Sequence, residues 1–476
     1  MAREWMKLGL ALTVVAILAG SAAAADVSAA LAQIGQSNAR SLAVFRGNMT
    51  DEMGTREVIG PAFCIKADPP IFISLALDAR VKAANLTDFR LIPAGQPDKQ
   101  VKAELLGIDP ETNITFIKAT EPYEWVAVQF ARTSSVAFGQ PVFSVGLWPL
   151  DTGYQPYLGM GYVASFIRVP EQQVYVTGGA LTNVGTPVFN AEGVGIGIVG
   201  SQRFMNYQMM LSGRAANVGL KSQQESNLFL PVEEFAHVLD SIPASPSEVR
   251  RLPWMGIISL QPVSQSMAEV LSIDQPGVMI DNLVPGQPAD KAGLLGRDVI
   301  IAYNGEPLEK FPSPDMVVGG FTRKLMRAKP GDTVQLTVVG NQGRREVSVT
   351  LDPLPQLPEE ATRHLDRRAG MLVRDKIVMD QYVSLSGSAN VPGVVIVAIV
   401  DEMPAAKAGL QANDLIASID NKPVADLEAY KQVIAAVPVG ATVNFLIRRG
   451  SVDSTVQVQL PAEQQPQQPE TQPPQP

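Results

Sequence analysis

Two stretches of the chain share one spacing: PADKAGLLGRDVI at residues 288–300 and PAAKAGLQANDLI at residues 404–416. The same proline, alanine, lysine, glycine, leucine, aspartate and isoleucine positions recur in both stretches. Upstream, the tripeptide PGV at 276–278 matches PGV at 392–394 at the same offset. An identical spacing over this distance predicts two copies of one domain, each of roughly ninety to a hundred residues.

Each copy is predicted to be a small domain rich in strands. Apolar runs at 278–280 and 394–397 predict strands, and Pro-Ala-x-Lys-Ala with a following glycine predicts a short helix. In the second copy, the spacing of apolar residues over 427–436 predicts a longer helix. Its side chains near one face are those of Leu427, Tyr430, Lys431 and Ile434.

These blocks resemble the PDZ domains of HtrA-type proteases, over about 253–352 and 368–460. The resemblance implies that an extended peptide binds as an added strand, with its terminal carboxylate on the backbone amides of a loop. In the first copy that loop is expected around Gly256, because glycine lets the backbone approach the carboxylate closely. At the same offset the second copy has Leu372, and its nearest glycine is Gly370. Carboxylate capture by the second copy and simple packing against neighbouring domains therefore both remain open.

The resemblance gives a set of residues expected to contact a bound peptide. They are Trp254, Met255, Gly256 and Ile257 in the first copy, and Met371, Leu372, Val373, Leu427, Lys431 and Ile434 in the second.

The preceding region, 26–245, is predicted to consist of many short strands. Residues 141–146 and 162–167 have the apolar, β-branched composition of strands. A glycine-rich run at 193–200 contains the pattern GxGxxG, but no strand–loop–helix context surrounds it. We therefore interpret that run as a glycine-rich buried strand and not as a dinucleotide site.

Four stretches of this region resemble the protease domain of the HtrA/Deg family, in the family's order: GPAF at 60–63, IDPETNI at 108–114, FGQPV at 138–142 and NVGTPV at 183–188. The resemblance implies a mainly β fold, with a chymotrypsin-like double β-barrel followed by two PDZ domains. It also implies a homo-oligomer of the trimer type.

The catalytic positions implied by this resemblance are all substituted. Val184 stands at the nucleophile, Asn113 at the aspartate and Ala76 at the histidine. The chain has only two histidines, His237 and His364, and neither lies in the strand-rich segment where a general base belongs. Thr182 also replaces the glycine two residues before the nucleophile. We therefore expect no serine-protease activity from these positions.

Three classes of function follow from these observations. The first is an inactive protease homologue that binds extended or C-terminal peptides of envelope proteins as a scaffold, adaptor or chaperone-like factor. The second is an endopeptidase with a rearranged active site, for example a Ser–Lys dyad. The third is a structural envelope protein whose PDZ grooves are closed. No metal site or cofactor is expected, because two distant histidines and one cysteine offer no ligand cluster.

The ends of the chain carry a further set of expectations. Residues 1–25 have the basic start, short apolar core and Ala-x-Ala ending of a cleaved signal peptide, which predicts a periplasmic or secreted protein. An uncleaved membrane anchor remains the alternative for this segment. Residues 461–476 are nearly all proline, glutamine and glutamate and are predicted to be disordered. The net charge of −9, without a long basic stripe, argues against nucleic acid as a partner.

Two proline-rich stretches and the single cysteine carry the remaining expectations. Proline-rich stretches at 240–251 and 352–360 are expected to be linkers between the domains. The single cysteine, Cys64, lies in an apolar run and is expected to be buried, although an intermolecular disulfide remains open.

Overall fold

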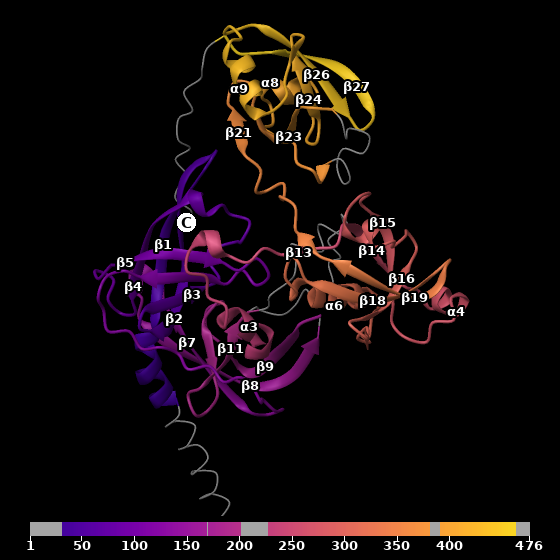
Figure 1. Cartoon of the computed structure of the whole chain (residues 1–476). Coiled ribbons are helices and arrows are strands. Elements are labelled where there is room, and N and C mark those ends of the chain that lie inside the picture. Colours follow the sequence, from indigo (N-terminus) through magenta and orange to yellow (C-terminus); the bar gives the residue numbers. More distant parts are fainter. Residues whose placement is uncertain (1–30, 169, 201–226, 381–390, 463–476) are drawn as a thin grey trace, which may run out of the picture. The chain divides into compact units, whose positions relative to one another are not determined.

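The computed structural model describes residues 31–168, 170–200, 227–380 and 391–462. The predicted signal peptide and nearly all of the predicted C-terminal tail lie outside these residues. The chain forms two compact units, with the change from one to the other at Leu354 and Pro355. Two closed barrels and a first PDZ-type sheet lie in one unit, and a second PDZ-type sheet lies in the other (Figure 1). The predicted mainly β fold is confirmed.

The first barrel has the strand order β1-β2-β3-β6-β5-β4 and closes through pairing of β1 with β4, for example Phe45 opposite Leu91. Its core contains a T-shaped pair of the Phe72 and Trp125 rings, 4.6 Å apart. The strands are β1 (Leu42–Asp51), β2 (Gly54–Ala67), β3 (Pro70–Ser74), β4 (Leu86–Pro93), β5 (Val101–Ile108) and β6 (Thr115–Ala119).

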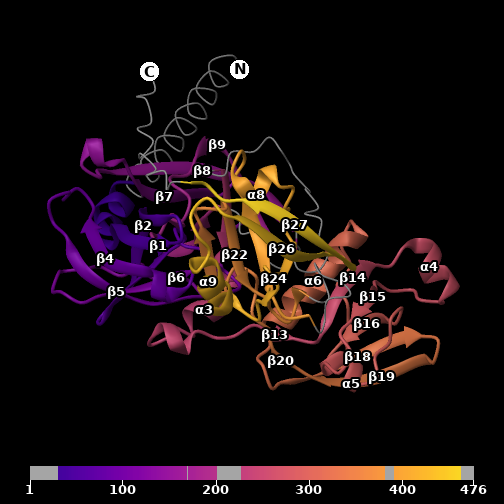
Figure 2. The same cartoon turned by 90° about the horizontal axis from the view of Figure 1, so that it is seen from above.

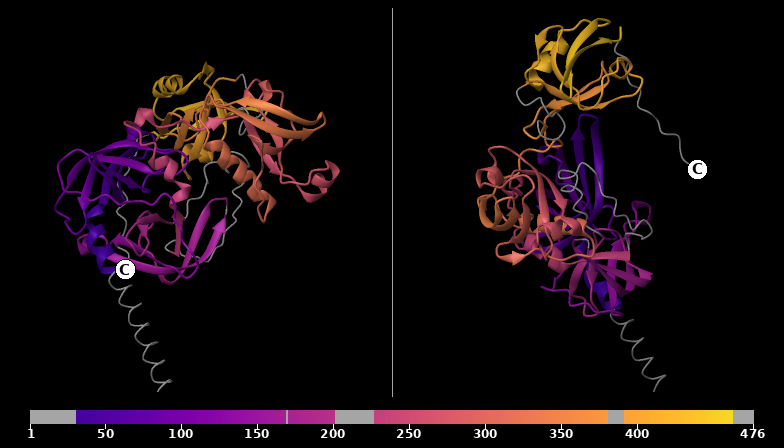
Figure 3. Two further views of the ribbon diagram at one scale, coloured as in Figure 1. Left: turned by 60° about the horizontal axis from the view of Figure 1, so that its bottom comes forward. Right: turned by 90° about the vertical axis from the view of Figure 1, so that its right-hand side faces the viewer.

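The second barrel has the order β10-β11-β12-β9-β8-β7, and Figure 3 shows it in magenta beside the indigo first barrel. The strands are β7 (Pro141–Leu147), β8 (Pro156–Arg168), β9 (Gln172–Ala180), β10 (Pro187–Phe189), β11 (Gly195–Val199) and β12 (Leu228–Pro231). The predicted buried glycine-rich strand is β11, whose residues are all buried. Glycine is required at Gly197, because an added Cβ would lie 2.4 Å from the Leu230 carbonyl oxygen.

Cys64 lies on β2 opposite Phe72 of β3 and is fully buried. Its Sγ contacts the Lys66 carbonyl oxygen at 3.0 Å. Burial raises the pKa of the thiol to about 12, although hydrogen bonds to the backbone of Lys66 and Ile71 act against this rise. The expectation of a buried structural cysteine is confirmed.

The first PDZ-type domain has the sheet order β14-β15-β16-β18-β19, and β14 lies beside α6 (Figure 2). Its strands are β13 (Pro253–Trp254), β14 (Ile257–Pro262), β15 (Val278–Leu283), β16 (Val299–Tyr303), β17 (Glu306–Pro307), β18 (Thr333–Gly340), β19 (Gly343–Thr350) and β20 (Asp352–Pro353). Its helices are α4 (Gln265–Val270), α5 (Pro288–Lys291) and α6 (Pro314–Met326). The short helix predicted from Pro-Ala-x-Lys is α5.

The second PDZ-type domain has the order β21-β22-β23-β24-β26-β27. Its strands are β21 (Arg363–Asp366), β22 (Met371–Asp375), β23 (Val394–Ile399), β24 (Leu415–Ile419), β25 (Lys422–Pro423), β26 (Thr442–Arg449) and β27 (Val452–Gln459). Its helices are α8 (Pro404–Lys407) and α9 (Leu427–Ala435). The sheet begins at Arg363, upstream of the predicted boundary at 368, because Arg363–Asp366 pairs with β22 as β21.

Within the described part of the chain, no helix has the length and apolarity needed to cross a membrane.

Candidate functional site

The loops that carry the three substituted catalytic positions meet between the barrels. Asn113 follows β5 with φ of 56°, a left-handed conformation that asparagine tolerates. Its Oδ1 accepts a hydrogen bond of 3.0 Å from the amide of Ala79, in the loop after β3 that also carries Ala76. A Cβ added to Gly185 would lie 3.5 Å from the Leu75 side chain, so the loop before β10 reaches the same place.

Val184 presents only methyl groups at the nucleophile position, and its side chain is 41% exposed. The neighbouring Asn183 is turned toward β7, where its Oδ1 accepts a hydrogen bond of 2.9 Å from the Leu147 amide. Neither described histidine lies in these loops, since His237 is in α3 (Ala236–Leu239) and His364 is in β21. The structure therefore brings together the loops that carry Ala76, Asn113 and Val184, and none of these three side chains has a hydroxyl, carboxylate or imidazole group.

The backbone amide of Thr182 is already paired. It donates a hydrogen bond of 2.9 Å to the buried Ser144 Oγ, and Thr182 Oγ1 lies 2.8 Å from Thr186 Oγ1. In chymotrypsin-like enzymes, the amide two residues before the nucleophile is one of the two donors that stabilise the oxyanion. At Thr182 this donor points to an internal hydroxyl.

The loop that the sequence predicts to bind a carboxylate lies between β13 and β14 of the first PDZ domain. The carbonyl oxygens of Met255 and Gly256 accept hydrogen bonds from Ala289 (2.7 Å) and Val284 (2.8 Å), which fix the loop. Over the described residues, no acceptor pairs with the amides of Met255 and Gly256. The next strand, β14, is the last strand of its sheet, and no described strand pairs with its outer edge. The helix α6 lies beside β14. This edge and these amides are the places where the sequence predicts that a peptide binds.

Of the residues predicted to contact a peptide in the first copy, one requires glycine and the other three are buried. Gly256 has φ of 83°, and an added Cβ would lie 2.4 Å from Gln287 Cβ, so this position requires glycine. Trp254, Met255 and Ile257 are buried, and so they support the loop from within the domain.

The second PDZ domain corrects the residue correspondence predicted from the repeat. Ala405 and Val400 donate to the carbonyl oxygens of Ala369 and Gly370, at 2.9 and 2.8 Å. These bonds repeat those made to Met255 and Gly256, and Gly370 has φ of 74°. Gly370 is therefore the counterpart of Gly256, and the glycine has not been lost. The repeat spacing places Leu372 opposite Gly256, two residues too far along the chain. The reason is that the segment between β22 and β23 is longer than the segment between β14 and β15.

The other peptide-contacting residues predicted in the second copy are mostly internal. Met371, Val373, Leu427 and Ile434 are buried in the core of this domain, and Leu372 is half-buried. Lys431 Nζ pairs with Glu428 Oε1 at 2.6 Å on the outer side of α9. Most of these side chains therefore lie inside the domain, and their contact with a bound peptide stays a prediction.

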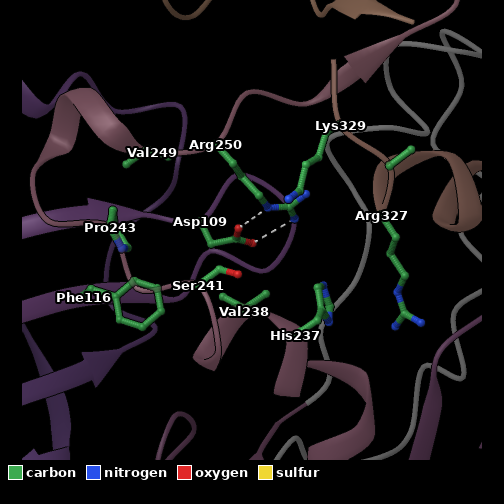
Figure 4. A pocket seen from close by; sticks show the side chains of 11 residues that line it. Asp109, Phe116, His237, Val238, Ser241, Pro243, Val249, Arg250, Arg327 and Lys329 are labelled. Atoms are coloured by element: carbon green, nitrogen blue, oxygen red, sulfur yellow. Dashed lines mark hydrogen bonds and ion pairs between the residues drawn. The ribbon is translucent and has the colours of Figure 1, made fainter. Parts of the chain in front are cut away.

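A cluster of charged residues that the sequence analysis missed lies between the barrels and the first PDZ domain (Figure 4). Arg250 Nε lies 2.7 Å from Asp109 Oδ2, and its Nη2 also pairs with Glu111. His237 Nε2 lies 3.0 Å from Glu111 Oε2, and Arg327 Nε lies 3.8 Å from Glu111 Oε1. Burial opposes ionisation of Glu111, but the hydrogen bond to His237 and the charges of His237, Arg250 and Arg327 lower its pKa overall. Nothing in the sequence links Arg250 to Asp109, which is 141 positions away.

The same cluster continues to the helix beside β14. Arg323 of α6 lies 3.2 Å from Glu234 and donates a hydrogen bond of 3.0 Å to the Pro170 carbonyl oxygen. The nearby carboxylate of Glu171 is buried, and neither of its oxygens has a hydrogen-bond partner within the described residues. Burial raises the pKa of Glu171 to about 9; the charge of Arg323 opposes this rise, and the charges of Glu234 and Glu111 add to it. Among the described residues, no group of three or more histidine, cysteine, aspartate or glutamate side chains could hold a metal ion.

Comparisons with known proteins agree with this architecture. The trypsin-like peptidase domain family matches residues 76–198, and the PDZ domain family matches 253–351 and 369–460. A probable periplasmic serine endoprotease DegP-like protein of Hahella chejuensis is 28% identical over 365 residues, covering 74% of this chain and 71% of the relative. A protein of the same name from Ectopseudomonas mendocina is 24% identical, covering 82% and 77%.

A solved structure of the HtrA-type protease AlgW with a tripeptide has the same fold, at a TM-score of 0.51 and 19% identity, covering 69% of this chain and 98% of that one. The chain therefore belongs to the HtrA family, with a trypsin-like peptidase domain followed by two PDZ domains.

Proposed function

We propose that this chain is an exported HtrA-type pseudoprotease that captures peptide segments through its first PDZ domain. The observation that carries the proposal is the unpaired edge of β14 beside the free amides of Met255 and Gly256. An extended peptide can pair along β14 while its C-terminal carboxylate accepts from those amides. A fixed loop with outward N–H groups costs little reorganisation on binding.

The absence of cleavage is proposed from three substitutions that act on different steps. Val184 cannot attack a carbonyl carbon, no imidazole is available in these loops to take a proton, and the Thr182 amide is held by Ser144. Removal of a complete triad lowers turnover by a factor on the order of 10⁶.

Location, ligand class and assembly are proposed from the family. The relatives are named periplasmic endoproteases, which, together with the signal-like residues 1–25, supports export to the periplasm. The AlgW structures are described with a tripeptide and with a decapeptide, which supports peptides as the ligand class. A homo-oligomer of the trimer type is proposed from the family resemblance alone, and the molar mass in solution tests it.

The test combines peptide binding with proteolysis on one sample of the chain from Asp26. In a titration with a library of C-terminal peptides, we expect micromolar binding that Gly256→Glu weakens by about 10- to 100-fold, because a charged hydrogen bond contributes about 1.5–3 kcal/mol. In a casein assay, we expect no cleavage above the background of a mock purification. Library binding that Gly256→Glu leaves unchanged would contradict the role of this loop.

A rearranged active site is the second candidate, and one observation bears on it. Ser241, His237 and Asp109 line the same pocket (Figure 4). Glu111 Oε2 lies 3.0 Å from His237 Nε2. However, over the described residues no hydrogen bond joins Ser241 to His237, and Arg250 forms ion pairs with both Asp109 and Glu111. We therefore expect Ser241→Ala and His237→Ala to leave the background in the casein assay unchanged. Cleavage that persists through purification and falls in both variants would establish this candidate instead.

A further inference from the structure

The second PDZ domain already has a strand on the edge where a peptide would add. In the first domain β14 is the last strand of its sheet, but its counterpart β22 pairs with β23 on one side and with β21 on the other. The pairing with β21 is antiparallel over the whole of Arg363–Asp366, with Leu365 opposite Leu372. A segment of the chain itself therefore occupies the position of an added strand.

This strand has the direction of a bound peptide and carries a carboxylate at the matching end. β21 is antiparallel to β22, so its C-terminal residue, Asp366, lies at the loop before β22. Asp366 Oδ1 accepts hydrogen bonds of 3.0 Å from the amides of Arg368 and Ala369, and its carbonyl oxygen accepts one of 2.8 Å from Gly370. In the first domain, the counterparts of Ala369 and Gly370 are Met255 and Gly256, whose amides have no partner among the described residues.

The helix on the other side of the groove also holds β21. The Tyr430 hydroxyl of α9 donates a hydrogen bond of 2.8 Å to Asp366 Oδ2, and the His364 ring lies 6.2 Å from the Tyr430 ring. Arg368 donates at 2.9 Å to the Val437 carbonyl oxygen, just beyond the end of α9. The strand is thus bound by β22, by the loop and by α9, which are the three parts that bind a peptide in a PDZ groove.

We infer that the second PDZ domain is occupied by its own Arg363–Asp366 strand, with the Asp366 side chain in place of a peptide's terminal carboxylate, so that it takes a free peptide only after this strand is displaced. The inference rests on the proposed function, because it assigns peptide capture in the resting chain to the first domain. The ligand class that would displace β21 is an extended peptide with a free C-terminus.

A covalent tether makes this occupation hard to overcome. A ligand held by a short linker has an effective concentration on the order of millimolar. For a groove with an intrinsic Kd on the order of 10 μM, such a tether weakens binding of a free peptide by about 100-fold. Displacement of β21 should therefore reveal a binding site that the unmodified chain conceals.

Hydrogen exchange tests the occupation without any variant. In the full chain from Asp26, we expect the amides of 371–375 to be protected on both sides of β22, while alternate amides of 257–262 exchange quickly. Addition of a peptide selected on the first domain should protect 257–262 and leave 371–375 unchanged. Fast exchange at alternate amides of 371–375 in the free chain would overturn the inference.

The second arm measures binding of a fluorescent peptide ATRHLD, a copy of 361–366 with a free C-terminus, in a Gly256→Glu background. We expect Asp366→Ala and Leu365→Pro each to bind it about 100-fold more tightly than the parent, because one removes the carboxylate and the other disrupts the pairing. The matched control, Asp453→Ala, removes an exposed carboxylate on β27 and should bind like the parent.

Each outcome of this arm has a defined meaning. Equal binding by the parent and both variants would overturn the inference, as would a failure of both variants to bind after exchange shows β22 released. If the variants bind, but the chain with Gly256 intact binds no library peptide, the proposed function of the first domain fails while the occupation of the second one stands.

Discussion

Arg250→Met is expected to lower the free energy of unfolding of the barrel-containing unit by about 3–5 kcal/mol, because removal of one partner leaves buried charges uncompensated. The side chains of Asp109 and Glu111 are 6% and 1% exposed, so water cannot replace the guanidinium. Arg250 also donates a hydrogen bond of 2.9 Å to the Met326 carbonyl oxygen, at the end of α6. The loss should therefore affect the barrels and the first PDZ domain together, and urea denaturation followed by tryptophan fluorescence would measure it.

Two matched variants separate charge compensation from general damage. Arg251→Met removes an exposed neighbour whose guanidinium bonds, among the described residues, to the Leu354 carbonyl oxygen alone. This change should alter stability by less than about 0.5 kcal/mol. Addition of Asp109→Asn and Glu111→Gln to Arg250→Met should recover much of the lost stability, because no buried charge then lacks a partner. If Arg250→Met and Arg251→Met unfold at the same urea concentration, the charged cluster does not hold the two domains together.

Glu171→Gln is expected to stabilise the same unit by about 3 kcal/mol at pH 7 and to have almost no effect at pH 4.5. Burial raises the pKa of Glu171 from its ordinary value of 4.5 to about 9. Between these values the folded chain keeps a proton that the unfolded chain has lost. Unfolding therefore releases a proton, and this group makes the folded state progressively less stable as the pH rises from 4.5 to 9. Glutamine is neutral throughout and removes that dependence.

Unfolding free energies at pH 4.5, 6 and 7.5 would measure this difference. The control is Glu192→Gln, which changes an exposed glutamate in the turn between β10 and β11. Its unfolding free energy should equal that of the parent at every pH. A Glu171→Gln curve parallel to that of the parent would mean that Glu171 is ionised in the folded chain. Arg323 would then be the group that compensates its charge.

The internal repeat predicted the PDZ architecture because its spacing is fixed by backbone geometry. Proline begins α5 and α8, and Gly293 and Gly409 take φ of 82° and 85° after them, so neither spacing nor residue type can vary. The same spacing placed Leu372, and not Gly370, opposite Gly256. The spacing is that of the repeated stretches after β22, and the segment between β22 and β23 is longer than its counterpart in the first copy. The Ala369 carbonyl oxygen accepts from Ala405 as the Met255 carbonyl oxygen accepts from Ala289, which makes Gly370 the counterpart of Gly256. These hydrogen bonds cannot be read from the sequence spacing.

The features that decide the candidate site are contacts between distant segments. The identity of Val184 predicted a missing nucleophile directly, whereas the pairing of Thr182 with Ser144 depends on the closure of the second barrel. Residues 363–366 form a short segment with charged side chains, a composition typical of a linker. They form a strand because they pair with β22. Likewise Arg250 lies in a proline- and serine-rich stretch, and its partners become visible only when the first barrel has folded.

The buried thiol of Cys64 has a consequence for experiments. With a pKa of about 12, roughly one molecule in 100,000 carries a thiolate at pH 7, and the thiolate is the species that reacts with disulfides and maleimides. The chain contains no other cysteine. A single cysteine introduced on β14 or β21 would therefore be the only group to take a spectroscopic label, and distances from it could be followed in the native chain without first removing Cys64.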